Sequence, residues 1–454
     1  MSSQNRKNVA IIGAGPVGLA AAAHVLERGH VPVVLEAGAE IGHSIRQWSH
    51  VRLFSPWTYN IDKASQRLLE PVGWNSPNPD YFPTGGEFLD GYLVPLATRT
   101  ALKDYIRTSC RVTGVSRVGF DKLKTQGRDR APFEIRYQNG AGIKSVLADA
   151  IIDASGTSTS PNPAGANGLR AIGEESALKR IVYGMPDILG HERVRYAGRR
   201  VAVLGAGHSA AGSLIELVTL AKDVPATQIV WLFRGNDPSK SFGGGANDKL
   251  SARGELGTEL GRVVADGQVK VETGFRVTHI AETEQGLRIA AGSACCGRHV
   301  VVDELIVASG FRPDMSFLSE LRLSLDPALE CPPILAPLID PNVHSCGTVR
   351  PHGARELSQP ESGLYLAGIK SYGRAPTFLM ATGYEQVRSI AAQIAGDVEA
   401  AERVELELPE TGVCTVSRSS DQTTGCCGDA APVHAEAGSC CTSAEKAKEA
   451  ACCS

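Results

Sequence analysis

The stretch Asn8-Val-Ala-Ile-Ile-Gly13-Ala-Gly15-Pro-Val-Gly18-Leu-Ala-Ala-Ala-Ala decides the fold of this chain. It predicts a short apolar strand, a glycine turn and an alanine-rich helix that begins at Pro16. In such a turn Gly13 permits the tight bend, Gly15 lets the backbone approach a pyrophosphate, and Gly18 allows close helix–strand packing. The helix N-terminus then directs free N–H groups and a partial positive charge at the phosphates. The stretch therefore predicts a dinucleotide-binding site.

The residues that follow support this interpretation. A second apolar strand, His30–Leu35, ends at Glu36, 18 residues after Gly18. This spacing is close to the roughly 20 residues expected for the acid that binds a ribose hydroxyl. The glycine pattern alone would be a weak signal, but here strand, turn, helix, strand and acid occur in the required order. A buried strand over Ile151–Gly156 is expected to close this first nucleotide unit.

The same pattern occurs a second time, at Arg200-Val-Ala-Val-Leu-Gly205-Ala-Gly207-His208-Ser209-Ala210. Alanine in place of the third glycine is an allowed variant. The next strand, Gln228–Phe233, ends at Arg234, and an arginine at this point suits the 2′-phosphate of NADP, whereas an acid would suit NAD. A strand over Glu304–Gly310 closes this second unit. The predicted NADP-binding residues are Gly205, Gly207, His208, Ser209, Ala210, Arg234 and Gly310.

Length and composition set the outer limits of the interpretation. The chain has 454 residues, enough for two to three domains, and its 43% hydrophobic and 21% charged residues are ordinary for a globular protein. A net charge of −3 argues against nucleic-acid and anionic-membrane partners. No apolar run is long enough to span a membrane. Arg6 and Lys7 before an apolar stretch imitate a signal peptide, but cleavage would destroy the glycine turn, so we expect a cytoplasmic protein.

We therefore expect an α/β protein with two Rossmann-like dinucleotide-binding domains, the second inserted in the first. The expected divisions are 1–160 and 311–400 for the first domain, 161–310 for the second domain with its linker, and 401–454 for a tail. The strand and turn of Gly363–Gly368 and a helix from about Thr377 to Ala395 belong to the returning part of the first domain. The tail has few large apolar residues and is expected to be disordered.

Two nucleotide sites in one chain indicate one tightly bound redox cofactor and one exchangeable electron donor. From residue 8 to about 395 the chain resembles the flavin-dependent monooxygenases with two dinucleotide-binding domains. The resemblance implies FAD at the first site and NADPH at the second. It implies that NADPH reduces FAD, that reduced FAD and O₂ give a C4a-hydroperoxide, and that a soft nucleophile takes the distal oxygen. The FAD-binding residues are then Gly13, Gly15, Pro16, Gly18, Glu36, Trp48, Ser155, Gly156, Gly368 and Ser371.

The chain departs from that family at two points. The family's linker signature, Phe-x-Gly-x-x-x-His, is matched here by a segment from Tyr183-Gly184 to His191 with a longer gap between glycine and histidine. Many relatives carry Asp after the last turn glycine, where this chain has Ile369, so that Lys370 or Ser371 becomes the candidate contact to the flavin. The chemistry demands no acidic or basic side chain. Three polar residues are candidates by their placement, or else ordinary structural residues: Asn60, His208 and Arg374.

The cysteines are unevenly distributed. Seven of the twelve follow Pro409, six of them as the vicinal pairs Cys426-Cys427, Cys440-Cys441 and Cys452-Cys453. Trivalent arsenic is thiophilic, and soft centres select thiolate ligands. Flavin body and paired-cysteine tail together resemble the flavin monooxygenases of arsenic-resistance operons. This resemblance implies that arsenite or a trivalent organoarsenical is oxygenated to the pentavalent form. Alternatives for the tail are a thiol redox shuttle, a zinc site, which adjacent cysteines disfavour, and an inert segment.

Three other functions stay open at this stage. One is a pyridine-nucleotide disulfide or metal reductase, which needs a flavin-proximal Cys-x-x-Cys or Cys-x-x-x-x-Cys pair, and neither spacing occurs in this chain. Another is S- or N-oxygenation of an organic substrate, and a third is a metal-binding protein that kept the fold without its activity. In the body, Cys295-Cys296 is expected at a hairpin tip, Cys331 and Cys346 as a thiol site near the flavin, and Cys110 in the core.

Overall fold

The computed structural model describes residues 6–243, 251–292, 297–343, 349–376 and 378–406, with the side chain of Ser251 excepted. The expected hairpin-tip pair Cys295-Cys296, the expected thiol Cys346 and the paired cysteines between 426 and 453 lie outside these residues. Within the described residues, no helix combines the length and apolar character needed to cross a bilayer.

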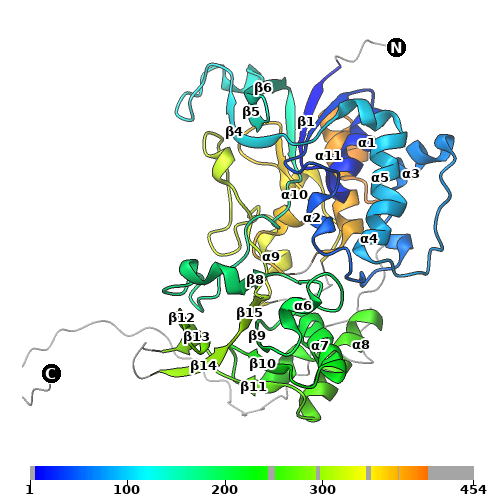
Figure 1. The fold of residues 1–454 in the computed structure, drawn as a ribbon. Helices are drawn as coiled ribbons and strands as arrows, with labels where there is room; N and C mark the ends of the chain where they lie inside the picture. The colour runs from blue at the N-terminus through cyan, green and yellow to red at the C-terminus, as the bar shows by residue number, and fades with distance from the viewer. Residues whose placement is uncertain (1–5, 244–250, 293–296, 344–348, 377, 407–454) are drawn as a thin grey trace, which may run out of the picture. The chain divides into compact units, whose positions relative to one another are not determined.

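The first glycine turn belongs to a five-stranded parallel sheet. Its order is β16-β7-β1-β2-β3, with bounds Leu364–Leu366, Ala150–Asp153, Asn8–Ile12, Val31–Leu35 and Ile106–Arg107. Helix α1 (Pro16–Glu27) packs against α11 (Met380–Ala395), and the two run side by side in Figure 1. The small side chains of the fully buried Ala20–Ala23 let these helices approach closely. The chain therefore returns to its first domain at its C-terminal end, as predicted.

The sequence of Gly86–Ala97 predicts a helix, and the structure confirms it, although the helix is not regular. It consists of α4 (Gly85–Phe88), a π-helical turn (Leu89–Leu93) and α5 (Val94–Arg99). Pro95 has no N–H to donate to the carbonyl one turn earlier, that of Gly91. The indole Nε1 of Trp74 donates to this carbonyl instead, at 2.7 Å. The remaining helices of four or more residues on this sheet are α2 (His43–Arg46), α3 (Lys63–Leu69), α10 (Ala354–Leu357) and α12 (Val398–Glu402).

A three-stranded antiparallel sheet is attached to the first domain. The sequence predicts two strands here, near 110–118 and 133–138, and they correspond to β4 (Arg111–Arg117) and β5 (Phe133–Asn139). A third strand, β6 (Gly142–Ala148), completes the sheet. The sequence did not reveal β6, because most of its side chains are exposed and carry no burial pattern. A buried ion-pair group centred on Glu361 joins this sheet to the loop that precedes β16.

The second glycine turn belongs to a second parallel sheet, of order β11-β10-β9-β15-β8. Its strands are Lys270–Glu272, Gln228–Leu232, Arg200–Leu204, Glu304–Val307 and Ile181–Tyr183, all between β7 and β16 in sequence. Helices α7 (His208–Asp223) and α8 (Ser251–Ala265) pack on each other beside it (Figure 1). The antiparallel strands β12 (Val277–Thr283), β13 (Gly286–Ala291) and β14 (Arg298–Val302) form a further sheet, and α6 (Arg193–Tyr196) is short. Helix α9 (Ala336–Ile339), also short, packs in the core of the first domain. Two dinucleotide-binding folds, one within the other, are thus confirmed.

One expectation about the linker was wrong. The prolines and glycines of residues 161–198 predict a linker, yet this segment contains β8, which pairs in parallel with β15 through Leu305 and Ile181. Three residues of strand carry too short a pattern to be recognised, and the prolines and glycines around them dominate the sequence signal. Because β8 ends at Tyr183, the end of the linker is fixed at the edge of the second sheet.

Glu361 provides a test of how the first domain is held together. Its fully buried carboxylate accepts bonds from Arg117 Nε at 2.9 Å and from Arg128 Nη2 at 2.8 Å. We expect Glu361→Gln to lower the free energy of unfolding by about 3–5 kcal/mol, because two buried guanidinium groups lose their counter-charge. Urea unfolding measures this loss. In the matched control, Glu134→Gln, the partner Arg136 is exposed, and the unfolding midpoint should not change.

Candidate active site

A cavity of about 460 Å³ lies beside the glycine turn between β1 and α1. Most residues predicted for the first nucleotide site line it, although they come from five separate parts of the chain. These residues are Gly13, Gly15, Pro16, Glu36, Trp48, Ser155, Gly156 and Gly368. Gly18 and Ser371, also predicted, lie outside the cavity wall. The cavity is therefore the candidate cofactor site of the first domain.

The geometry of the first turn fits a dinucleotide. Gly13 has φ +101°, and a Cβ there would lie 2.7 Å from the carbonyl oxygen of Ala154. A Cβ on Gly18 would lie 2.0 Å from the carbonyl oxygen of Gly13, so only glycine permits this crossing of helix and turn. A Cβ on Gly15, in contrast, would meet no protein atom within 4 Å. No side chain caps the N-terminus of α1, which leaves its N–H groups for an anionic ligand.

Glu36 occupies the position expected for a ribose-binding acid. Its carboxylate lines the cavity and accepts bonds from Ala14 N at 2.8 Å and Gly38 N at 2.7 Å. These bonds fix the carboxylate and leave it further lone pairs for a ligand hydroxyl. Trp48 also lines the cavity and packs against Gly85, where a Cβ would lie 2.7 Å from the indole ring. The turn, the acid and the arrangement of the loop fit FAD.

The second turn repeats this geometry. Gly205 has φ +151°, a Cβ there would lie 2.4 Å from the carbonyl oxygen of Ala308, and the space around Gly207 is open. The N-terminus of α7 has no side-chain cap, and Ser209 in its first turn lines the cavity. The other predicted NADP residues, Gly205, Gly207, His208, Ala210, Arg234 and Gly310, do not line it. Arg234 is exposed, and its Nη1 lies 3.4 Å from the carbonyl oxygen of Ala166.

Sequence reasoning missed the cavity residues that come from the linker and from the loop after β15. Tyr183, Gly184, Met185 and Phe311 all line the cavity. Tyr183 donates its hydroxyl to the buried Glu174 at 2.5 Å, and burial first, then this carboxylate, raises the pKa of Tyr183. These residues follow β8 and β15, whose carboxyl ends meet at one edge of the second sheet, where ligands of such sheets bind. Only knowledge of β8 could have revealed them.

Hydrogen bonds from Gln386 of α11 fix the turn after β16. Gly368 N donates to Gln386 Oε1 at 2.8 Å, and Gln386 Nε2 donates to Ser371 Oγ at 2.9 Å and to His352 Nε2 at 2.8 Å. Burial lowers the pKa of His352, which keeps this ring neutral and able to accept that bond. Ser371, predicted to contact the flavin, instead donates to the carbonyl oxygen of Gly368 at 2.7 Å. The group fixes the turn, and Gly368 and Ile369 face the cavity.

None of the three candidate catalytic residues lines the cavity. Asn60 is fully buried, and its side chain bonds to the hydroxyl and the carbonyl oxygen of Ser55. Arg374 lies at the surface, with its Nη2 2.7 Å from Glu330. The His208 ring packs edge-on against Phe54, with ring centroids 5.3 Å apart. All three therefore have structural surroundings in the described part of the chain.

Two cysteines are described, and neither has the character of a redox thiol. Cys110 lines the cavity next to Glu36, whose carbonyl oxygen accepts the Cys110 N–H at 2.7 Å, and burial raises the pKa of its thiol. Cys331 is fully buried away from the cavity wall, and burial raises its pKa to about 12. A reactive cysteine needs a lowered pKa. Among the described residues, no group of three or more His, Cys, Asp or Glu is placed to hold a metal ion.

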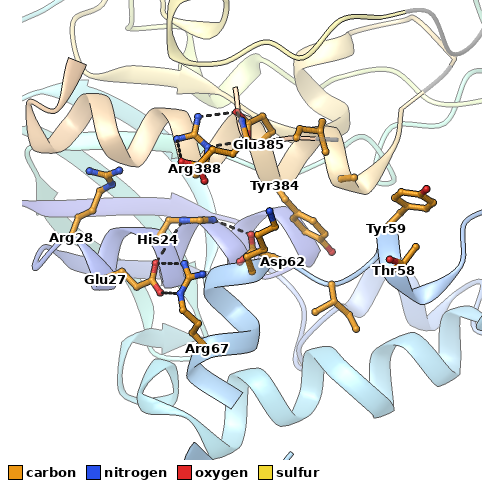
Figure 2. Close-up of a pocket in the computed structure, with 15 residues that line it drawn as sticks. His24, Glu27, Arg28, Thr58, Tyr59, Asp62, Arg67, Tyr384, Glu385 and Arg388 are labelled. Carbon is orange, nitrogen blue, oxygen red and sulfur yellow. Dashed lines mark hydrogen bonds and ion pairs between the residues drawn. The ribbon is translucent and has the colours of Figure 1, made fainter. Parts of the chain in front are cut away.

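A larger cavity, of about 720 Å³, lies on the other side of α1, between α1, α3 and α11 (Figure 2). No residue of either glycine turn borders it. Its charged side chains bind one another: His24 Nε2 lies 2.9 Å from Asp62 Oδ1, and Arg67 Nε lies 2.7 Å from Glu27 Oε1. Burial would raise the pKa of Asp62, but His24 and the Ser65 bonds lower it. The larger cavity is thus lined by charged side chains that pair with one another, and it is separate from the cofactor site.

Comparison with known proteins agrees with this site. Residues 10–332, more than half of the chain, match the family described as pyridine nucleotide-disulphide oxidoreductase. The chain belongs to this family. Flavin-containing monooxygenase FMO GS-OX-like 2 of Arabidopsis thaliana is 23% identical over 242 residues, which are 48% of each protein. The chain thus spans about half the length of this curated relative.

Solved structures of the same fold include both reductases and monooxygenases. Bacillithiol disulfide reductase Bdr of Bacillus cereus has a TM-score of 0.64 at 22% identity, over 86% of this chain and 99% of that one. The cadaverine monooxygenase DfoA of Erwinia amylovora, bound to FAD, has a TM-score of 0.58 at 14% identity, over 91% and 99%. At such identities the likeness concerns the fold. Family and site together make this member of the pyridine nucleotide-disulphide oxidoreductases an FAD-dependent oxidoreductase, and they support FAD and NADPH as its cofactors.

Substitutions of two glycines in the first turn test cofactor binding and folding separately. Gly15→Ala should leave the unfolding temperature of the apoprotein unchanged, because its Cβ meets no protein atom, yet weaken FAD binding roughly tenfold or more by blocking the backbone approach. Gly18→Ala should fail to yield a stable first domain, because its Cβ meets the Gly13 carbonyl. Differential scanning fluorimetry and flavin content measure the two effects. Normal flavin content in Gly15→Ala would contradict the assignment of the cavity.

Arg234 provides the corresponding test for the second site. If it contacts the 2′-phosphate of NADPH, Arg234→Ala should raise the KM for NADPH about tenfold or more, because a charge-assisted hydrogen bond is lost. The KM for NADH, which lacks this phosphate, should not change. Steady-state NADPH and NADH oxidation by the same preparation measures both. An equal effect on the two cofactors would remove Arg234 from the 2′-phosphate site.

Proposed function

We propose that this protein is an NADPH- and O₂-dependent flavin monooxygenase that oxygenates a neutral, soft nucleophile. The observation that carries the proposal is the composition of the cofactor cavity. Residues of both dinucleotide-binding folds line it, and its single thiol among the described residues, Cys110, adjoins Glu36. A disulfide reductase needs a cysteine pair at the flavin, and no such pair lines the described wall.

The two ends of the cavity differ in chemistry. Near Glu36 lie other ionisable side chains, those of His43, Cys110 and Arg111. A second part of the wall, formed by the second fold and by the start of α11 with the segment before it, is uncharged. Its large apolar residues are Phe311, Phe378 and Met380. Because hydride transfer brings the nicotinamide against the flavin, we assign the reacting end of the cofactor to this second part.

The chain's own residues would perform three tasks in this reaction. The glycine turn and Glu36 would hold FAD, the second turn and Arg234 would hold NADPH, and the aromatic wall would exclude water. When bound, FAD takes two electrons from NADPH and delivers them to O₂, so that one oxygen atom reaches the substrate and the other leaves as water. The lone pair of the substrate forms the new bond to oxygen. No protein acid or base is required to activate such a nucleophile.

The wall at the reacting end favours an uncharged substrate. Tyr183 is the ionisable residue there, and its proton is donated to Glu174. No carboxylate lines this part of the described wall, so a protonated amine would lack a counter-charge. Trivalent arsenicals and thioethers are uncharged near neutral pH and carry a reactive lone pair. We therefore propose trivalent arsenic, as arsenite or an organoarsenical, as the substrate, and S-oxygenation as the second candidate.

The paired cysteines of the tail favour arsenic over sulfur within this class. Six thiols in vicinal pairs match the ligand preference of trivalent arsenic. A tethered thiol pair raises the local concentration of the captured metalloid near the same chain's active site. We further propose that the reaction takes place in the cytoplasm, since removal of the first apolar stretch as a signal sequence would delete the turn at Gly13.

The test follows NADPH oxidation and arsenic oxidation state in air with full-length, FAD-loaded protein. We expect a trivalent aryl arsenical to stimulate NADPH oxidation and to give one pentavalent product per NADPH, with cadaverine without effect. A chain ending at Pro409 should have a raised KM for the arsenical and an unchanged KM for an aryl thioether. Stimulation by a disulfide that persists without O₂ would instead establish the reductase. Unchanged arsenical turnover in the shortened chain would refute the role of the tail.

A further inference from the structure

A buried charged group lies directly behind the wall of the cofactor cavity. The ammonium Nζ of Lys370 is 2.6 Å from Asp153 Oδ2 and 3.0 Å from Ser155 Oγ. The side chains of Lys370 and Asp153 are completely buried, whereas Ser155 lines the cavity. The parallel pairing of β7 with β16, which aligns Asp153 with Leu366, brings the three residues together. Neither glycine turn contributes to this group.

The hydrogen bonds fix the orientation of the Ser155 hydroxyl. Its Oγ donates to Asp153 Oδ1 at 2.7 Å, and the Ser155 backbone N–H binds the same oxygen at 3.1 Å. An ammonium group donates and never accepts, so the contact with Lys370 uses one lone pair of the hydroxyl oxygen. The Ser155 proton is therefore committed to Asp153. The second lone pair of the Ser155 hydroxyl oxygen remains free for a ligand in the cavity. Toward such a ligand Ser155 can therefore only accept a hydrogen bond.

Lys370 itself is held in place by its surroundings. Its ammonium lies 4.3 Å from the centre of the Phe317 ring, a further favourable contact for a buried cation. The neighbouring Ile369 faces the cavity with an apolar side chain, so this turn offers the cofactor no side-chain acceptor of its own. The acceptor at this part of the wall is instead Ser155, supported from behind by Lys370.

We propose that Lys370 is a positioning residue for the cofactor, and that it acts through Ser155. With Lys370 in place, Ser155 accepts a hydrogen bond from a hydroxyl group of FAD. The acceptor role of Ser155 limits which group of FAD can bind there. Ribose and ribityl hydroxyls can donate a hydrogen bond to such an acceptor, whereas the ionised phosphates cannot. The proposal concerns the binding of FAD alone, and it holds whichever substrate the enzyme oxygenates.

The test is a double-mutant cycle on FAD affinity in the full-length chain, measured by quenching of FAD fluorescence on addition to the apoprotein. Ser155→Ala should raise the Kd for FAD about tenfold in the wild-type background. In a background with Asp153→Asn and Lys370→Met, where both buried charges are removed together, the same change should raise it about twofold or less. Thermal unfolding reports the stability of each variant separately.

A second buried ion pair of the same domain provides the matched control. Arg388 and Glu385 pair at 2.8 Å on α11, away from the cofactor cavity. In a background with Glu385→Gln and Arg388→Met, Ser155→Ala should keep its full tenfold cost. An equal cost of Ser155→Ala with and without Lys370 would show that the ion pair serves stability alone and would overturn the proposal. So would wild-type FAD affinity in Ser155→Ala, a single change that removes only one hydroxyl.

Discussion

The structure depends on a contact that leaves no room for a methyl group. Helix α1 crosses the first turn so closely that a Cβ on Gly18 would lie 2.0 Å from the carbonyl oxygen of Gly13. This crossing aims the uncapped helix N-terminus at the cavity, and Gly13 of the same turn lies against Ala154, the residue that follows β7. In the second fold Gly205 lies against the carbonyl oxygen of Ala308, as Gly13 lies against that of Ala154, whereas Ala210 takes the place of Gly18. Both nucleotide sites therefore follow from the steric requirements of a few glycines.

Those steric requirements explain which features could be predicted from the sequence. A strand, a glycine turn, a helix and an acid at fixed spacing are local, so the turn at Gly13, the acid Glu36 and the second turn at Gly205 could be recognised. The end of the cavity that we propose as the reacting end could not be predicted in this way. Phe311 and Tyr183 reach it because β15 pairs with β8, a three-residue strand inside an apparent linker. A contact that depends on long-range strand pairing leaves no periodic signal in the chain.

Lys370 shows a second limit of sequence reasoning. An exposed or cofactor-facing lysine was the natural expectation for a residue in a turn, and the structure places it fully buried. Its partner Asp153 is more than two hundred residues away in sequence, at the end of a strand whose other residues are apolar. A buried charge is stable only beside its counter-charge. One such pair thus couples the wall of the cavity to the returning segment of the first domain, and another, around Glu361, couples the antiparallel sheet to it.

The distribution of charge in the cavity connects the fold to the chemistry. Dinucleotide phosphates and ribose need the turn, the helix N-terminus and Glu36, and these polar groups gather at the first sheet. The reaction that we propose would need the opposite at its reacting end, a wall that keeps water away while a neutral lone pair attacks oxygen. Such a wall is formed by Phe311, Phe378 and Met380, from the segment that follows β15 and from the start of α11 with the segment before it. A neutral soft nucleophile would lose little hydration on entering such a wall, whereas an ammonium ion would lose much, and in the function that we propose this difference would select the substrate class without a dedicated recognition residue.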